Sequence, residues 1–175
     1  RKTIEPIIVP DIKDGCRIIC KSHVGCVRDE NQDFMGYAQC GTKHIVVVAD
    51  GMGGHSGGYE ASRIAITSAH EFFNENHDHL SPHELLHGYI STANKSVHQA
   101  AQNSHLSQGM GTTIVVALIE NGQAWLGHVG DSRIYLHRNE QLSLLTLDHS
   151  RVNRMVEHGL IRLEEADDHP MSNLL

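Results

Sequence analysis

The alternation of apolar and polar residues predicts strands toward both ends of the chain. Val46, Val47 and Val48 form an unbroken β-branched run, which predicts a strand buried on both faces. Short strands separated by turns are expected over residues 16–49, with Gly41 and Thr42 as a hairpin loop before the valines. Asn121-Gly122, the strongest short hairpin signal, separates two more strand-like segments. The expected strands of the second half cover residues 112–119, 123–129, 134–136 and 142–145.

Helical patterns lie between and after these strands. Residues 59–76 carry apolar side chains at helical spacing, and a second stripe of this kind continues to Ala100. The second stripe begins with Ser81-Pro82-His83-Glu84, a capping box with proline at the first helical position. Ser150 is expected to cap a short helix through His158, which Gly159 ends. Helices grouped between antiparallel strands predict an α+β fold.

Composition narrows the class of protein. The 175 residues suffice for one domain with one core. Lys and Arg number 14 against 21 Asp and Glu, a net charge of −7, which disfavours a nucleic-acid partner. No apolar segment approaches the roughly 20 residues that span a bilayer, and the first residues lack a signal-peptide pattern. The sequence therefore predicts a soluble, cytoplasmic protein with no membrane partner.

The cysteines cluster early in the chain but lack a paired C-x-x-C spacing. A zinc site is thus a minor interpretation, and buried, reduced thiols are favoured. The histidines are scattered and form no H-E-x-x-H motif. The four cysteines are Cys16, Cys20, Cys26 and Cys40.

Aspartates follow three predicted strand ends or turns. Asp50 ends the valine-rich strand and precedes a burst of glycines, whose exposed carbonyls can join a carboxylate in binding a hard cation. Asp33 closes a turn-like segment that also contains Arg28, and Asp131 follows Gly130. Three such aspartates with one arginine and no nucleophile elbow indicate metal-assisted chemistry on an anion.

Five motifs in order resemble the protein phosphatase 2C family of metal-dependent serine/threonine phosphatases. They are RDENQD (28–33), ADGMGGH (49–55), GMGTT (109–113), GHVGDSRIYL (127–136) and LTLDHS (145–150). The DGMGGH form is similar to that of bacterial members. The resemblance runs from about Lys21 to Leu175, which implies a lead and first strand over residues 1–20 and a phosphatase domain over 21–175. It implies an antiparallel β-sandwich flanked by helices.

The resemblance also implies roles for individual residues. Asp33, Asp50 and the Gly51 carbonyl would hold two Mg²⁺ or Mn²⁺ ions, and a metal-activated water would attack phosphorus. Arg28 would bind the substrate phosphate bidentately. Asp131 either helps to bind a third ion or anchors its turn. The substrate would be phosphoserine or phosphothreonine in a protein, opposing a serine/threonine kinase.

The chain departs from the family pattern at several positions. Met52 stands where eukaryotic relatives carry a proposed general acid, and that role passes neither to Met52 nor to His55. Gln32 replaces a common glutamate, which could shift metal affinity. The family has two later aspartates, one in an Asp-Gly motif and one in an Asp-Asn motif, and neither can be assigned in this sequence. Asp167 and Asp168 are followed by neither glycine nor asparagine. The last part of the domain is therefore expected to be missing, and this segment alone to be impaired in turnover.

Two other functions are compatible with parts of the sequence. A dinucleotide-binding enzyme fits poorly, because the region after Gly53 lacks the second strand ending in an acid. The serious alternative is a non-catalytic, phosphatase-like binding or regulatory module. The presence of Arg28, Asp33 and Asp50 argues against it, since a scaffold has no need of these groups.

Overall fold

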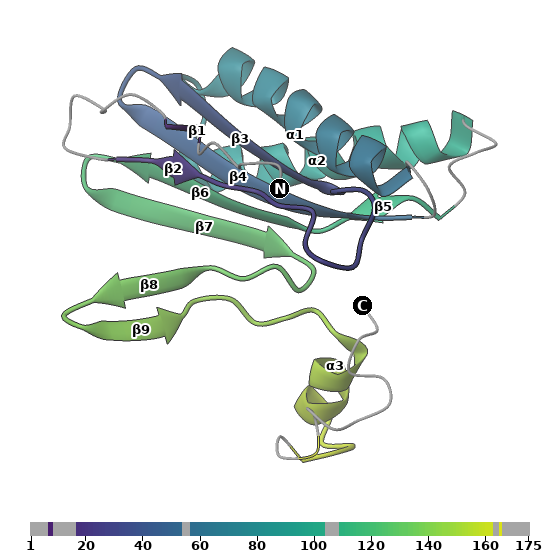
Figure 1. Cartoon of the computed structure of the whole chain (residues 1–175). Coiled ribbons are helices and arrows are strands. Elements are labelled where there is room, and N and C mark those ends of the chain that lie inside the picture. Colours follow the sequence, from purple (N-terminus) through teal and green to yellow (C-terminus); the bar gives the residue numbers. More distant parts are fainter. Residues whose placement is uncertain (1–6, 9–16, 54–56, 104–108, 163–164, 166–175) are drawn as a thin grey trace.

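The computed structural model describes residues 7–8, 17–53, 57–103, 109–162 and 165. Helices and antiparallel strands both occur, so the α+β prediction is confirmed (Figure 1). His55, Cys16, Asp167 and Asp168 lie outside the described residues. The elements are β1 (Ile7–Ile8), β2 (Ile19–Cys20), β3 (Asp33–Cys40), β4 (Lys43–Met52), α1 (Gly57–Asn76), α2 (Pro82–Asn103), β5 (Gly111–Thr112), β6 (Ile114–Glu120), β7 (Gln123–Val129), β8 (Tyr135–Arg138), β9 (Gln141–Leu144) and α3 (Arg151–Glu157).

A five-stranded antiparallel sheet forms the centre of the molecule. Its strand order is β3-β4-β6-β7, and β5 pairs with the C-terminal end of β4. The predicted hairpins are both present, around Gly41-Thr42 and around Asn121-Gly122. The φ angles of Asn121 and Gly122 are 50° and 73°, the positive pair that a tight two-residue hairpin turn requires.

Two long helices cover one face of this sheet. α1 packs on β3 and β4, and α2 packs on β6 and β7 beside α1 (Figure 1). The predicted capping box at the start of α2 is confirmed: the Ser81 backbone N–H donates to Glu84 Oε2 at 2.9 Å, and the Glu84 N–H donates to Ser81 Oγ at 3.4 Å. Within the described part of the chain, no helix combines the length and the apolar character needed to cross a bilayer.

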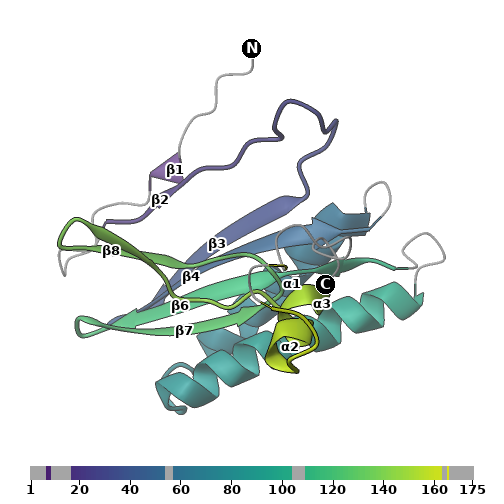
Figure 2. The same ribbon diagram turned by 90° about the horizontal axis from the view of Figure 1, so that it is seen from below.

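The valine-rich strand is buried on one face, so the prediction of burial on both faces is wrong. Ile45, Val47 and Ala49 face the helices and are at most 1% exposed, whereas Val48 is 43% exposed on the other face. The physical reason is coverage, since α1 and α2 lie on the same side of the sheet. On the opposite side lies the β8–β9 hairpin, seen in front of the sheet in Figure 2.

The last helix among the described residues is α3, the short helix that the sequence predicts. Ser150 caps α3 by accepting a hydrogen bond from the Asn153 N–H at 3.1 Å, and Gly159 has a φ of 67° just beyond the helix. β1 and β2 pair with each other beside β3. The division into residues 1–20 and 21–175 stays a prediction.

The described cysteines are free thiols. Cys20 and Cys40 are partly buried, and Cys26 is exposed, so the expectation of buried thiols is wrong for Cys26. The reason is local: Cys26 lies in the irregular segment between β2 and β3, outside the core.

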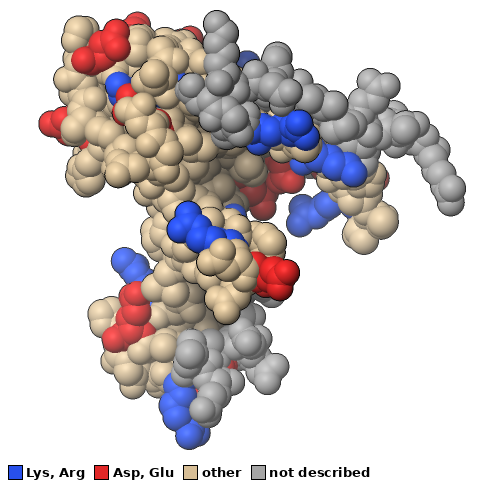
Figure 3. Space-filling model, turned by 90° about the vertical axis from the view of Figure 1, so that its left-hand side faces the viewer, with Lys and Arg blue, Asp and Glu red and all other residues tan. Residues whose placement is uncertain are grey.

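The end of the sheet that carries the hairpin turns has paired charges. Lys43 Nζ lies 3.3 Å from Glu120 Oε1, and Thr42 Oγ1 donates to the same oxygen at 3.0 Å. Figure 3 views the molecule from this end, and basic and acidic side chains are interspersed there among uncharged ones.

Candidate metal and phosphate site

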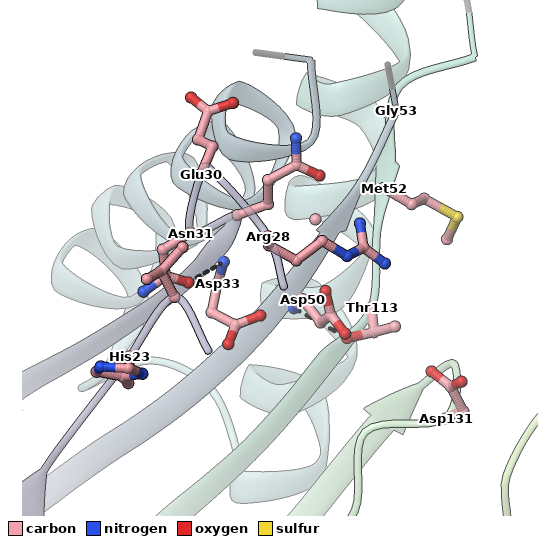
Figure 4. Close-up of a pocket in the computed structure, with 13 residues that line it drawn as sticks. His23, Arg28, Glu30, Asn31, Asp33, Asp50, Met52, Gly53, Thr113 and Asp131 are labelled. Carbon is pink, nitrogen blue, oxygen red and sulfur yellow. Dashed lines mark hydrogen bonds between the residues drawn. The ribbon is translucent and has the colours of Figure 1, made fainter. Parts of the chain in front are cut away.

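A polar pocket of about 670 Å³ lies at the other end of the sheet. Four parts of the chain line it: the segment that leads into β3, the end of β4, Thr113 after β5, and the turn after β7 (Figure 4). It contains all four side chains that the sequence assigned to the site, namely Arg28, Asp33, Asp50 and Asp131.

Asp33 and Asp50 are brought together by strand register. Asp33 begins β3 and is the Cα partner of Asp50 on β4. Directly opposed residues of an antiparallel pair point to the same face, with Cβ atoms about 4.5–5.5 Å apart. That face is the one opposite the helices, so both carboxylates open into the pocket (Figure 4).

The environment of Asp50 raises the pKa of its carboxyl group above the ordinary value of 3.8. Partial burial is the largest cause, followed by the charge of Asp33, a hydrogen bond with Asp33 and the charge of Asp131. Arg28 acts in the opposite direction. The pocket therefore concentrates negative charge that the single arginine only partly offsets.

Gly51 allows three backbone segments to meet beside Asp50. Its N–H donates to the Gln32 carbonyl at 3.1 Å. A Cβ atom at Gly51 would lie 1.9 Å from the Gly58 carbonyl oxygen and 2.8 Å from that of Gln32. Only glycine fits, so the site end of β4 packs directly against the first turn of α1.

Arg28 lies in the segment between Ser22 and Asp33, and the Asn31 side chain bonds to both ends of this segment. Asn31 Oδ1 accepts the Asp33 N–H at 3.1 Å, and Asn31 Nδ2 donates to Ser22 Oγ at 2.7 Å. Arg28 is exposed, and its guanidinium lies beside Asp50 in the pocket (Figure 4). A planar guanidinium in this place matches the oxygens of a phosphate.

Asp131 lies across Asp50 from Asp33, on the turn that follows β7 (Figure 4). Gly130, before it, has a φ of 104°, a conformation that favours glycine. The turn is fixed by a hydrogen bond from the His149 N–H to the Gly130 carbonyl at 2.9 Å.

Sequence reasoning missed His23 and Glu30 as pocket residues. His23 Nδ1 accepts the Gly25 N–H at 2.9 Å, which leaves Nε2 as the protonated nitrogen of the neutral ring. No sequence signal identified it, because the histidines are scattered. The GMGTT motif includes Thr113, which also lines the pocket.

The donors of this pocket are those that a hard divalent cation prefers. Asp33, Asp50, Asp131 and the Gly51 carbonyl all offer oxygen, and Arg28 only partly offsets the negative charge around Asp50. Within the described residues, no three His, Cys, Asp or Glu side chains are already grouped as a complete metal cage. Mg²⁺ needs no such cage, because it keeps several waters and takes one or two carboxylates.

Comparisons with known proteins identify relatives of this chain. The family described as protein phosphatase 2C matches residues 25–157. Protein phosphatase PhpP of Streptococcus pneumoniae is 37% identical over 155 residues, 87% of this chain and 63% of the relative. The chain thus spans a little under two thirds of that relative's length.

Solved structures show the same fold. The serine/threonine phosphatase of S. agalactiae superimposes with a TM-score of 0.78 at 33% identity, covering 99% of this chain and 67% of that one. The catalytic domain of the phosphatase PstP in complex with two manganese ions superimposes with a TM-score of 0.63 at 32% identity, covering 81% and 60%. The motifs, the fold and these matches lead to one conclusion: the chain belongs to the protein phosphatase 2C family.

Proposed function

We propose that the complete natural protein hydrolyses phosphoserine and phosphothreonine in proteins with the help of Mg²⁺ or Mn²⁺. The observation that carries the proposal is the pairing of Asp33 with Asp50, which sets two carboxylates on one face of the sheet beside Arg28. The relatives named as phosphatases and the manganese-bound neighbour support the same reading.

Asp33, Asp50 and the Gly51 carbonyl would hold a two-metal centre. Bound divalent ions lower the pKa of a coordinated water and offset charge on the phosphate oxygens. The carboxylates would supply the negative charge that holds the ions. Burial, followed by the charge of Asp33, raises the pKa of Asp50, and a bound cation would offset that charge.

Arg28 binds the phosphate in this proposal. Its guanidinium extends from an exposed segment into the open pocket, so a phosphorylated side chain on a protein surface can reach it. Asn31 holds the segment in place through Ser22 and the Asp33 backbone. Asp131 would assist a third ion, with anchoring of its turn as the alternative.

The opposing serine/threonine kinase and the cytoplasmic location stay predictions from the sequence. The impaired turnover of residues 1–175 alone also stays a prediction.

The test is phosphate release from a phosphothreonine peptide by the complete natural protein. After treatment with a chelator, turnover should be lost and should return on addition of Mn²⁺. A protein that binds the peptide but releases no phosphate at any Mn²⁺ concentration would contradict the proposal and favour the non-catalytic module.

A further inference from the structure

Thr113 occupies a break in the sheet directly opposite Asp50. It lies between β5 and β6, and it is 3% exposed. Gly51 pairs with Thr112 on one side of the break and Val48 with Val115 on the other, in one continuous register. The residue that faces Asp50 across the two strands is therefore Thr113.

The hydrogen bonds between these two residues are unusual for a sheet. An antiparallel pair of this kind normally exchanges two bonds between backbone groups. The Thr113 N–H does donate to the Asp50 carbonyl at 2.9 Å, but the Asp50 N–H donates to Thr113 Oγ1 at 3.0 Å. The Thr113 carbonyl instead accepts from Thr112 Oγ1 at 2.9 Å. A side-chain hydroxyl thus replaces a backbone carbonyl at the residue that carries the central carboxylate.

The same hydroxyl connects Asp50 to the Asp131 turn. Thr113 Oγ1 lies 2.6 Å from Ser132 Oγ, the side chain next to Asp131. The threonine methyl packs on Gly130, where an added Cβ would lie 2.7 Å from Thr113 Cγ2. One buried side chain therefore contacts the backbone of Asp50 and both neighbours of Asp131.

We propose that Thr113 is a positioning residue that, with Ser132, fixes Asp50 and the Asp131 turn relative to each other. The proposal rests on the metal-binding function proposed above for these carboxylates. Without the hydroxyl, the Asp50 N–H loses its buried acceptor and the turn loses its link to the sheet. Metal affinity should fall, although Thr113 itself contacts no ion.

The test uses variants of the complete natural protein and calorimetric titration with Mn²⁺. Thr113→Val keeps the branched shape and removes the hydroxyl, and it should weaken Mn²⁺ binding about tenfold. Thr113→Ser keeps the hydroxyl and should restore most of the affinity. Ser132→Ala removes the partner alone and should give a smaller loss. Thr42→Val, which removes a hydroxyl bridge at the far end of the sheet, is the matched control and should bind as the wild type does.

A second readout needs no metal. Amide hydrogen exchange at Asp50 should accelerate in Thr113→Val and stay slow in Thr113→Ser, because the acceptor of that N–H is the hydroxyl. Thermal unfolding of each variant shows that it is folded.

The outcomes separate this proposal from the function on which it rests. Wild-type protein that neither binds Mn²⁺ nor releases phosphate refutes the function. If the wild type binds Mn²⁺, two results overturn the role of Thr113: unchanged affinity in Thr113→Val, or an equal loss in Thr113→Ser and Thr113→Val, which would assign the effect to packing.

Discussion

The two ends of the β3-β4-β6-β7 sheet treat acidic side chains in opposite ways. At the hairpin end, the Glu120 carboxylate is neutralised by Lys43 and receives a hydrogen bond from Thr42. At the pocket end, Asp33 and Asp131 lie on either side of Asp50. Among the described residues that line the pocket, Arg28 is the one with a permanent positive charge. The same sheet thus carries a paired carboxylate at one end and, at the other, carboxylates whose charge Arg28 only partly offsets.

This difference supports the proposal that the pocket end of the sheet carries the chemistry. Charged side chains with a purely structural role are normally paired with an opposite charge. Carboxylates that repel one another in a pocket lower the stability of the protein unless a cation binds to them. The hairpin end can be changed with small effects. The pocket end should respond strongly to any change in its charge or in its backbone.

The largest expected effect is on turnover. Asp50→Asn in the complete protein should lower metal-dependent phosphate release at least about 100-fold, because even outer-shell partners of a metal are typically worth 10–100-fold. Glu120→Gln, the matched change at the other end, should leave turnover unchanged. The measurement is the steady-state rate of each variant over a range of Mn²⁺ concentrations. Similar rates for the two variants would contradict the proposed difference between the two ends of the sheet.

A pair of glycine substitutions compares the backbone at the two ends. Gly51→Ala should destabilise the protein by about 3 kcal/mol, because its Cβ would meet two carbonyl oxygens. Gly41, in the β3–β4 turn, has a φ of 58° and open space around its Cβ, so Gly41→Ala should cost only about 1 kcal/mol of left-handed strain. Urea unfolding of both variants gives the comparison. Equal costs would mean that the backbone at Asp50 can move aside.

Substitution of Arg28 tests the fixed positive charge that the described residues contribute to the pocket. Arg28→Ala should raise KM for a phosphothreonine peptide by about 10–100-fold, the value of charge-assisted hydrogen bonds to phosphate. Arg28→Lys should recover part of this loss, because an ammonium keeps the charge but not the bidentate geometry. The measurement is a KM and kcat series, and an unchanged KM in Arg28→Ala would remove this residue from phosphate binding.

The raised pKa of Asp50 predicts a smaller effect on the metal-free protein. The native state holds the Asp50 proton more tightly than the unfolded chain, whose value is 3.8, so this group reduces stability as pH rises from below 3.8 through the raised native pKa. Above that window the full penalty is present. Asp50→Asn lacks this titration, so at neutral pH without metal it should melt at a higher temperature than the wild type. A lower melting temperature for the variant would contradict this assignment.

Local signals in the sequence predicted most of the elements and the main pair of aspartates. Asn121-Gly122 and Ser81-Pro82-His83-Glu84 specify a turn and a cap through their own chemistry, so neighbours far away in the chain cannot easily override them. Asp50 was recognisable because it follows the valine-rich strand, and Asp33 because it closes a turn-like segment that leads into a strand. Register then brings the two together.

What the sequence did not predict depends on contacts between distant segments. Val48 looks like its neighbours in the valine run, and its exposure follows from which face the helices cover. Thr113 Oγ1 accepts the Asp50 N–H and contacts Ser132 of the Asp131 turn, and both partners are distant from it in the chain. His23 enters the pocket through an irregular loop that has no periodic pattern to reveal its direction.

The most direct test of the central claim is calorimetric titration of Mn²⁺ into the complete wild-type protein and into Asp33→Asn, Asp50→Asn and Glu120→Gln. The account predicts that wild type and Glu120→Gln bind alike, whereas Asp33→Asn and Asp50→Asn each lose most of the affinity. Binding of equal strength in all four proteins would contradict the claim that the Asp33–Asp50 pair is the metal site.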